Sequence, residues 1–187
     1  KQTGAIVYHG SPHKFDKFDS SKIGTGEGAQ AYGHGLYQAE AEDVAKQYLQ
    51  GDGYLYKSDL PDEHIAKMLD WDKPLSKQPK NVRDAYKKYL QSPQASEHAK
   101  AWTRYSEGMR LDQAEPLLKN PGGENLYKNA FPSREAANQW ASENGIPGIR
   151  YLDGGSRGTG AGTSNFVIFP QNEGLLQILE RNGKPIK

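Results

Sequence analysis

The chain has 187 residues, of which 35% are hydrophobic, and its 24 basic and 23 acidic residues leave a net charge of +1. This balance excludes the basic surface of a dedicated nucleic-acid binder, and the absence of cysteine excludes disulfides, thiol nucleophiles and cysteine-based zinc sites. The length suits one compact domain with a real core, and no apolar run approaches the roughly 20 residues that span a bilayer. We therefore predict a single domain over residues 1–187, with no membrane partner.

The first residue, Lys1, is not a methionine. This start predicts a monomeric domain that belongs to a longer protein, whose targeting signals lie elsewhere. Localisation is therefore open, with the cytoplasm of the producing or the target cell as the expectation.

Strand signals gather towards the two ends of the chain. "GAIVYHGS" (4–11) is a β-branched and aromatic run bounded by glycine and proline, and "GYLYKSDL" (53–60) alternates well enough for a strand. Near the other end, "GIRYLD" (148–153) and "NFVIF" (165–169) read as strands, and "LLQILERNG" (175–183) fits a strand or a short helix.

Helix signals lie between these strands. A loop rich in glycine and serine feeds "AEDVAKQYL" (41–49), which is composed of helix formers, and Pro61 with Asp62 is typical of a helix start. Residues 80–145 are polar, rich in lysine, alanine, glutamate and glutamine, and broken by prolines. This middle part is predicted to be helical.

The order of these signals predicts an α+β domain. A helical insertion, about residues 61–145, lies between two strand-rich ends whose first and last strands meet in one sheet. That sheet would bring His9, Tyr37 and Asn165 together.

Two features of this arrangement suggest a site for a flat ligand. His9 stands at a strand end beside Gly10, where an imidazole can bond a ribose hydroxyl and bare backbone can meet a flat amide. A partly buried core histidine is the alternative. Tyr37 and Tyr48 are eleven residues apart, about three helical turns, so both rings could face one cleft and sandwich a planar ring. Two tyrosines that pack a helix onto a sheet are the alternative.

Other motifs are disfavoured. The loops "GTGEG" and "GTGAG" lack the GxGxxG interval, and no GxxxxGK[ST] sequence occurs, so Rossmann and P-loop sites are not expected. The histidines have no HExxH spacing, and Asp16 with Asp19 does not begin an EF-hand series. We therefore predict no metal.

The strings "VYHGS" (7–11) and "YGHGLYQAEAEDVAKQY" (32–48) resemble the NAD site of the ADP-ribosyltransferase fold, in its diphtheria-toxin and poly(ADP-ribose) polymerase branch. That branch has His-Gly on its first strand and a Gly-x-Gly-[Ile/Leu]-Tyr-Phe-Ala motif with a second tyrosine further on. Gln38 replaces the phenylalanine. The strings "IGTGEGAQAYGHGLY" and "GIRYLDGGSRG", with "NFVIF", are similar to transferase domains of polyvalent proteins in phages and conjugative elements.

The resemblance implies a fold and a set of roles. The fold would be a split β-sandwich with a helical insertion, and the substrate NAD. His9 would hold the adenine-side ribose, Gly10 the nicotinamide carboxamide, and two tyrosines would stack on the nicotinamide ring, while Gly33 and Gly35 let backbone approach the cofactor. The cofactor-binding residues would be His9, Gly10, Ser11, Gly35, Tyr37 and Tyr48.

One position departs from the family pattern. Where the branch has a glutamate that stabilises the oxocarbenium-like charge, this chain has Asn165, which can accept a hydroxyl hydrogen bond but carries no charge. Glu27, in the loop before the Gly-x-Gly motif, is the candidate substitute, with a solvated loop glutamate as the alternative. The implied catalytic set is His9, Tyr37, Asn165 and Glu27.

The glycine-dense loop at residues 153–164 occupies the position from which such transferases contact the acceptor. Arg157 and Ser156 could touch an acidic or phosphate group there, and a plain flexible hairpin is the alternative. The implied function is an effector or toxin domain that moves ADP-ribose from NAD to a protein or nucleic-acid acceptor. An NAD glycohydrolase, and a non-catalytic NAD or ADP-ribose binding module, remain the alternatives.

Overall fold

The computed structural model describes residues 3–22, 31–49, 51–159 and 162–186, apart from 106–117 and the side chains of 102–105. The chain divides into two compact units, which are described separately. The sheet unit comprises Lys1–Met68 and Pro147–Lys187, and the helical unit comprises Leu69–Ile146. The candidate residue Glu27 lies outside the described residues.

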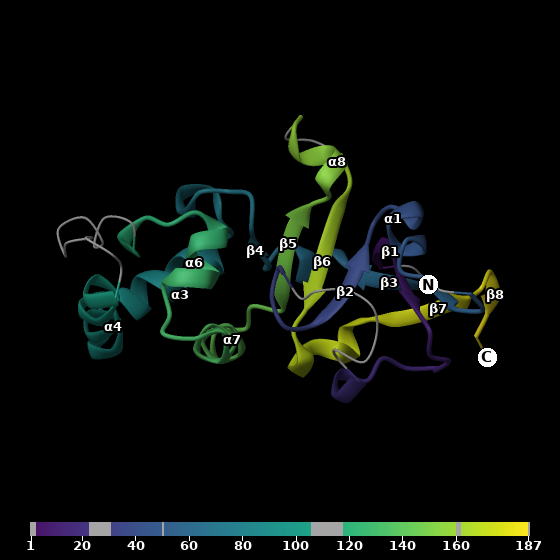
Figure 1. The fold of residues 1–187 in the computed structure, drawn as a ribbon, viewed down its shortest axis with the longest axis horizontal. Helices are drawn as coiled ribbons and strands as arrows, with labels where there is room; N and C mark the ends of the chain where they lie inside the picture. The colour runs from purple at the N-terminus through teal and green to yellow at the C-terminus, as the bar shows by residue number, and fades with distance from the viewer. Residues whose placement is uncertain (1–2, 23–30, 50, 106–117, 160–161, 187) are drawn as a thin grey trace. The chain divides into compact units, whose positions relative to one another are not determined.

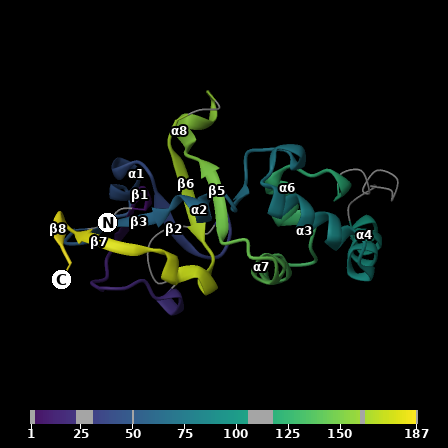
Figure 2. The same cartoon turned by 180° about the vertical axis from the view of Figure 1, so that it is seen from behind.

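The sheet unit is built on antiparallel strands that run in the order β5-β6-β2-β1-β3-β7-β8 (Figures 1 and 2). Strands from both ends of the chain therefore share one sheet, as the sequence predicts. Their bounds are β1 Gly4–Ser11, β2 Leu36–Ala39, β3 Tyr54–Pro61, β5 Gly148–Leu152, β6 Ser164–Ile168, β7 Gln177–Arg181 and β8 Lys184–Pro185.

The joint between β1 and β2 differs from its neighbours. β2 pairs with β6 along its whole length, and β1 does the same with β3. In contrast, β1 and β2 meet at a single register pair, Tyr8 with Ala39. Beyond this pair, towards the C-terminal end of β1, the two strands follow different partners, so the sheet opens between them.

The helices of the sheet unit are short, and two of them correct the sequence prediction. They are η1 Ser20–Lys22, α1 Glu42–Lys46, α2 Asp62–Ile65, α8 Gly154–Arg157 and η3 Pro170–Leu175. The helix expected over residues 41–49 is thus a single turn that ends at Lys46. The helix expected from Pro61 ends at Ile65, since Leu69 enters a short strand of the helical unit.

One face of the sheet, the core face, carries the apolar centre of this unit. Alternate residues of each strand point to it, as strand geometry requires. Its fully or nearly fully buried side chains are Val7, Leu36, Tyr56, Leu60, Met68, Phe166 and Ile168, with Phe18 and Leu176 from the connecting segments. The other residues of the same strands point to the opposite face, where α1 packs on β1 and β2.

The helical unit contains β4 Leu69–Asp70, η2 Leu75–Lys77, α3 Lys80–Leu90, α4 Pro93–Tyr105, α6 Gly123–Asn129 and α7 Arg134–Glu143. Helices α3, α4, α6 and α7 lie in the middle part that the sequence predicts to be helical. Aromatic rings form its core: Phe131 lies 5.0 Å from Trp140 and 4.4 Å from Tyr89, centroid to centroid. Ser133 caps α7, because its hydroxyl accepts from the backbone N–H of Ala136.

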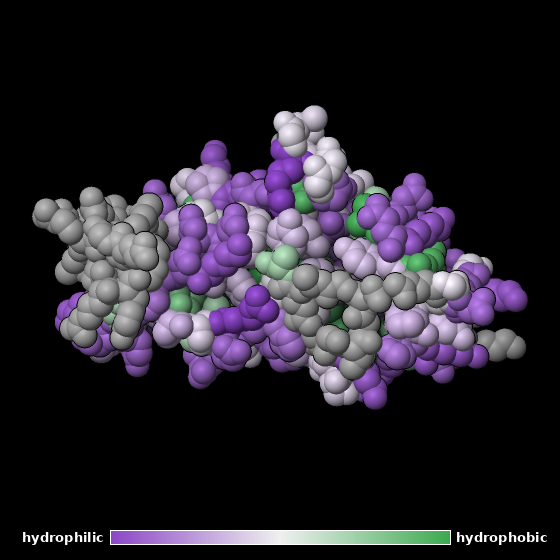
Figure 3. Space-filling view, in the orientation of Figure 1, coloured by the Kyte–Doolittle hydropathy of each residue, from purple (hydrophilic) through white to green (hydrophobic). Residues whose placement is uncertain are grey.

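These elements confirm the α+β class, and residues 177–181 resolve the open alternative at the C-terminal end in favour of a strand. None of the described helices combines the length and the apolar content that crossing a bilayer needs. Hydrophilic side chains dominate the visible surface, and hydrophobic ones occupy small separate areas (Figure 3).

Gln38 is a polar side chain buried in the apolar core face. It is 2% exposed, and neither its amide oxygen nor its amide nitrogen has a hydrogen-bond partner. Its cross-strand partner on β6 is Phe166, and Leu36 precedes it on the same face. The resembled family has an apolar phenylalanine here, so the sequence itself introduces this unpaired amide.

Replacing Gln38 with methionine is expected to stabilise the protein. The substitution keeps the shape of the side chain and removes two buried unpaired polar atoms, each of which costs about 1–3 kcal/mol. We expect the free energy of unfolding, measured by urea denaturation, to rise by about 1–3 kcal/mol. The exposed Gln47→Met is the control, expected to stay within about 0.5 kcal/mol. A loss of stability in Gln38→Met would mean that a buried water or ligand satisfies the amide.

Candidate functional site

His9 bridges the point where β1 and β2 part. Its ring nitrogen Nδ1 lies 2.7 Å from the backbone carbonyl oxygen of Tyr37. Because a carbonyl can only accept, the imidazole carries its proton on Nδ1 and presents Nε2 as an acceptor. The side chain thus satisfies a carbonyl that the β1–β2 ladder leaves unpaired.

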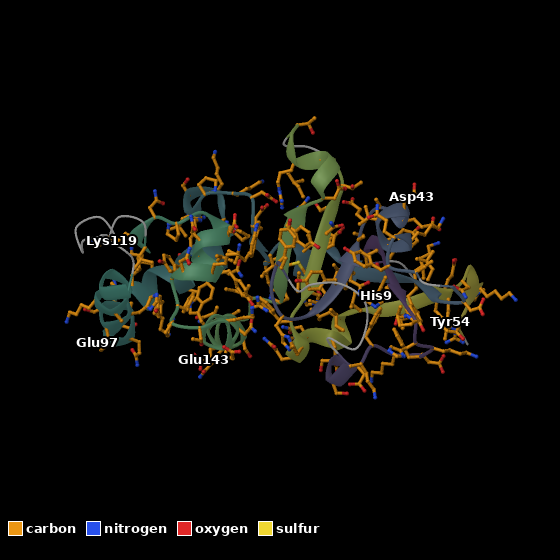
Figure 4. All side chains as sticks on the ribbon, viewed as in Figure 1. His9, Asp43, Tyr54, Glu97, Lys119 and Glu143 are labelled. Carbon is orange, nitrogen blue, oxygen red and sulfur yellow. The ribbon has the colours of Figure 1, made fainter. Side chains whose placement is uncertain are left out.

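The ring of His9, which Figure 4 labels, lies against aromatic side chains of the core face. Phe18 meets it edge-on with ring centroids 5.3 Å apart, and Phe15 and Tyr56 lie at 6.5 and 6.4 Å. Burial lowers the pKa of His9 below its ordinary value, although the bond to Tyr37 acts in the opposite direction. The imidazole is therefore held neutral in surroundings that match the alternative of a partly buried core histidine.

Gly10 and Ser11 have structural roles in this fold. A Cβ at Gly10 would lie 2.4 Å from the backbone oxygen of Ala45, so glycine is what allows α1 to lie on β1. Ser11 is buried, and its hydroxyl accepts from the backbone N–H of His13. A flat ligand at Gly10 would therefore have to approach along the opened strand edge and not from the face that α1 covers.

The two glycines before Tyr37 are also explained by packing. A Cβ at Gly35 would lie 2.4 Å from the carbonyl oxygen of Ile168 on β6. Gly33 has a φ of 120°, which disfavours residues with a side chain, and its carbonyl accepts the Tyr37 hydroxyl at 2.7 Å. The close approach of backbone to Tyr37 is thus made by the protein itself, and the approach of a cofactor there stays a prediction.

The helical spacing of Tyr37 and Tyr48 is corrected by the structure. Tyr37 belongs to β2, and Tyr48 follows the end of α1, where it is 45% exposed. Their phenol groups nevertheless approach a common neighbour, Tyr151 of β5. Burial first, and then the nearby phenols of Tyr37, Tyr48 and Tyr32, raise the pKa of Tyr151 well above its ordinary value.

Asn165 lies on the same face as Tyr37 and Tyr151, which we call the tyrosine face. On β6 it is paired in register with Ala39 on one side and with Tyr151 on the other. It is 6% exposed, and its amide oxygen Oδ1 has no hydrogen-bond partner. The structure therefore brings Asn165 and the tyrosines together, while alternation along β1 and β2 places the ring of His9 on the core face.

Sequence reasoning missed Tyr32 and Tyr151. Their rings are stacked with centroids 3.9 Å apart and an interplanar angle of 4°. Arg157 donates from Nη1 to the Tyr32 hydroxyl at 2.9 Å, and the Tyr32 backbone N–H donates to the Tyr37 hydroxyl at 3.0 Å. The alternation of "GIRYL" with a period of two was a usable signal that Tyr151 shares a face with Ile149, but its register against Asn165 was not readable.

The described part of the loop at residues 153–164 is held by several hydrogen bonds. Asp153 caps the short helix α8, because its Oδ1 accepts from the Ser156 backbone N–H at 2.9 Å. The Thr163 hydroxyl donates to the other oxygen of Asp153, and the Thr163 backbone N–H donates to the Ser156 hydroxyl at 3.0 Å. Arg157 contacts Tyr32, and residues 160–161 lie outside the described residues.

A carboxylate is anchored beside Asn165. Glu40, at the end of β2, accepts from the backbone N–H of Ser164 through Oε2 at 2.8 Å, and its own N–H donates to the Ser164 carbonyl at 3.0 Å. Within the described part of the chain, no three His, Asp or Glu side chains gather in a way that could hold a metal ion.

No protein-family model matches the chain, and no curated protein or solved structure matches it either. The chemistry of the site therefore has to be argued from its own groups. These are a buried amide oxygen without a donor, a cluster of tyrosines that can stack on a planar ring, and an opened strand edge beside a neutral histidine. The amide oxygen suits a hydroxyl group, and the tyrosines suit a flat ring.

The lowered pKa of His9 makes stability depend on pH. Between its folded pKa and its ordinary value of about 6.5, the unfolded chain binds more protons than the folded one, so stability rises with pH and the gain is complete above that range. We expect urea unfolding to show stability rising from about pH 5 to pH 7. The rise should shrink in His9→Asn and persist in the exposed control His13→Asn. An unchanged slope in His9→Asn would show that His9 is not the group responsible.

Proposed function

We propose that the sheet unit binds NAD and transfers its ADP-ribose group to a macromolecular acceptor, as an effector or toxin domain with an ADP-ribosyltransferase-like split β-sandwich. The observation that carries the proposal is the junction of β1 and β2. The strands with the His-Gly and Gly-x-Gly-Leu-Tyr motifs meet at one register pair and then separate, beside the strand that bears Asn165. Motifs far apart in the sequence are thereby neighbours.

The nicotinamide group and the two riboses of NAD have suitable partners near this junction. The opened edge of β1 next to Gly10 has backbone N–H and C=O groups that suit a carboxamide. Nε2 of His9 is an acceptor for a ribose hydroxyl, which would have to reach it on the core face, opposite the tyrosines. The half-buried ring of Tyr37 and the exposed ring of Tyr48 provide stacking surface for nicotinamide. The amide oxygen of Asn165 suits a hydroxyl of the nicotinamide-side ribose.

The site has an amide, and not a carboxylate, where positive charge would form during the reaction. Loss of nicotinamide leaves an oxocarbenium-like cation, which a carboxylate stabilises better than an amide does. Glu27, outside the described residues, is the candidate that the motif favours, and Glu40 is a second one because its carboxylate is fixed next to Asn165 by the Ser164 N–H. A site that relies on Asn165 alone would favour the second candidate function, a module that binds NAD without turning it over.

NAD is expected to stabilise the folded protein and to donate ADP-ribose. A ligand that binds only the native state adds RT ln(1 + [L]/Kd), about 2.7 kcal/mol at a hundredfold excess over Kd. A thermal shift with NAD tests binding, nicotinamide release tests cleavage, and incorporation of labelled ADP-ribose into lysate protein or nucleic acid tests transfer. No thermal shift at millimolar NAD would refute the cofactor assignment. Release without incorporation would indicate a glycohydrolase, and a shift without release a binding module.

Charge at the site is tested by three substitutions. Asn165→Glu is expected to raise the rate of nicotinamide release, because it adds a carboxylate where the cation forms. Glu27→Gln and Glu40→Gln, made separately, identify the native carboxylate, whose loss should lower turnover on the order of 10²-fold with little change in NAD affinity. Glu124→Gln in the helical unit is the control. If all three test substitutions leave the rate unchanged, neither glutamate nor Asn165 is catalytic.

A further inference from the structure

A cavity of the sheet unit lies outside the candidate site, where the hairpin of β7 and β8 meets the start of β3. Its volume is about 310 Å³, at the lower end of the range for small-molecule sites. Three cationic side chains line it, Lys14, Arg181 and Lys184, and no acidic residue of the described chain does so. Positive charge from three segments of the chain therefore converges on one hollow.

The hairpin that forms one wall of the cavity is fixed against β3. Asn182 and Gly183 have positive φ values of 51° and 76°, as a two-residue turn of type I′ requires, and Arg181 pairs with Lys184 across it. The Asn182 side-chain oxygen accepts from the Leu55 N–H at 2.8 Å, and the Asn182 N–H donates to the Leu55 carbonyl at 2.8 Å. The walls formed by β3 and the hairpin are therefore in place before a ligand binds.

An irregularity in the β3–β7 ladder turns Arg181 towards the core face. Tyr56 pairs with Arg181 and Ser58 pairs with Ile178, so β7 uses one residue more than β3 over this stretch. Ile178 packs on the core face, and strict alternation from it would send residue 181 to the opposite face. The extra residue re-aims the side chain, which is a common use of a β-bulge beside a binding site.

Arg181 is anchored and still has hydrogen-bond donors to offer. Its Nη1 donates to the Phe15 carbonyl oxygen at 2.8 Å and to Oδ1 of Asp16 at 2.6 Å. Both bonds use the same nitrogen, so the N–H groups of Nη2 and Nε remain for a ligand. Asp16 offsets the charge of Arg181, but Lys14 and Lys184 have no ion pair within the described part of the chain. Three cations against one carboxylate leave two positive charges uncompensated.

We propose that this cavity binds a small phosphorylated compound with a flat ring. Cations from three segments match the oxygens of a tetrahedral phosphate better than the two oxygens of a planar carboxylate. The ring of Tyr54, at the end of the sheet unit near β8 (Figures 1 and 4), provides stacking surface for the flat part. This site is separate from the candidate NAD site, because Tyr56 lies between His9 and Arg181 in a row of register partners, with β1 and β7 about 10 Å apart.

The anion site is tested by titrating the full chain with inorganic pyrophosphate at low ionic strength, followed through the backbone amide resonances in NMR. We expect saturable shifts centred on the β7–β8 turn. Lys14→Gln combined with Lys184→Gln should raise the dissociation constant about five- to tenfold, because exposed charge pairs are individually weak. Lys87→Gln combined with Lys88→Gln makes the same charge change on exposed positions of α3 and should bind as wild type. Shifts that do not saturate, or an equal loss of affinity in both double variants, would indicate general charge screening and overturn the proposal.

The flat ring is tested by comparing phenyl phosphate with inorganic phosphate. Wild type is expected to bind phenyl phosphate about three- to tenfold more tightly, because stacking on a tyrosine adds to the attraction of the charges. Tyr54→Leu should bring this ratio towards one, and Tyr54→Phe, which keeps the ring, should preserve it. Equal affinities in wild type would overturn the ring preference.

Separation from the NAD site is tested in the same titrations. Saturating NAD should leave the affinity for phenyl phosphate unchanged, and competition between the two would overturn the assignment of a separate site. The test does not depend on the proposed function, because a chain that binds no NAD is still expected to bind pyrophosphate at this cavity. Urea unfolding checks that every variant is folded.

Discussion

The hydrogen bond from the His9 imidazole to the Tyr37 carbonyl is the constraint on which the sheet unit depends. A carbonyl at the point where two strands part has lost its ladder partner, and burying it unpaired is costly. The imidazole supplies the missing donor and so allows β1 to stay with β3 while β2 stays with β6. Burial among Phe15, Phe18 and Tyr56 keeps the ring neutral, because a charged ring would be desolvated there, although the bond to Tyr37 acts in the opposite direction.

A second set of contacts fixes the opposite face of the sheet. The Tyr37 hydroxyl donates to the Gly33 carbonyl and accepts from the Tyr32 N–H, which folds the loop before β2 back on its own strand. That loop places the ring of Tyr32 against the ring of Tyr151, and α8 places Arg157 within hydrogen-bond distance of the Tyr32 hydroxyl. Two loops that are far apart in the sequence are therefore tied to one tyrosine of β5, beside the amide of Asn165.

Much of the fold could be predicted from local patterns, and the site only in part. β-branched runs and turn residues located β1, β3, β5 and β6, because strand signals are local. The helix expected over residues 41–49 spans only Glu42–Lys46, and strand β2 was not predicted, because its pairing with β6 is a non-local contact. For the same reason, the sequence could suggest that His9, Tyr37 and Asn165 are neighbours, but not that His9 points to the other face, since a side chain's face depends on register. The place of Tyr151 in the site could not be predicted, because it depends on which strand pairs with β5.

The two departures from the resembled family have opposite physical consequences. Gln38 places an unpaired amide on the core face, on the strand between β1 and β6. Burial of this amide without a hydrogen-bond partner lowers the stability of the fold. Asn165 places an unpaired acceptor on the tyrosine face, where phenol groups gather. Under the proposed function, the cost of burying Oδ1 without a partner is recovered when a ligand donates a hydrogen bond to it, which makes the site selective for ligands that bring a hydroxyl to that point.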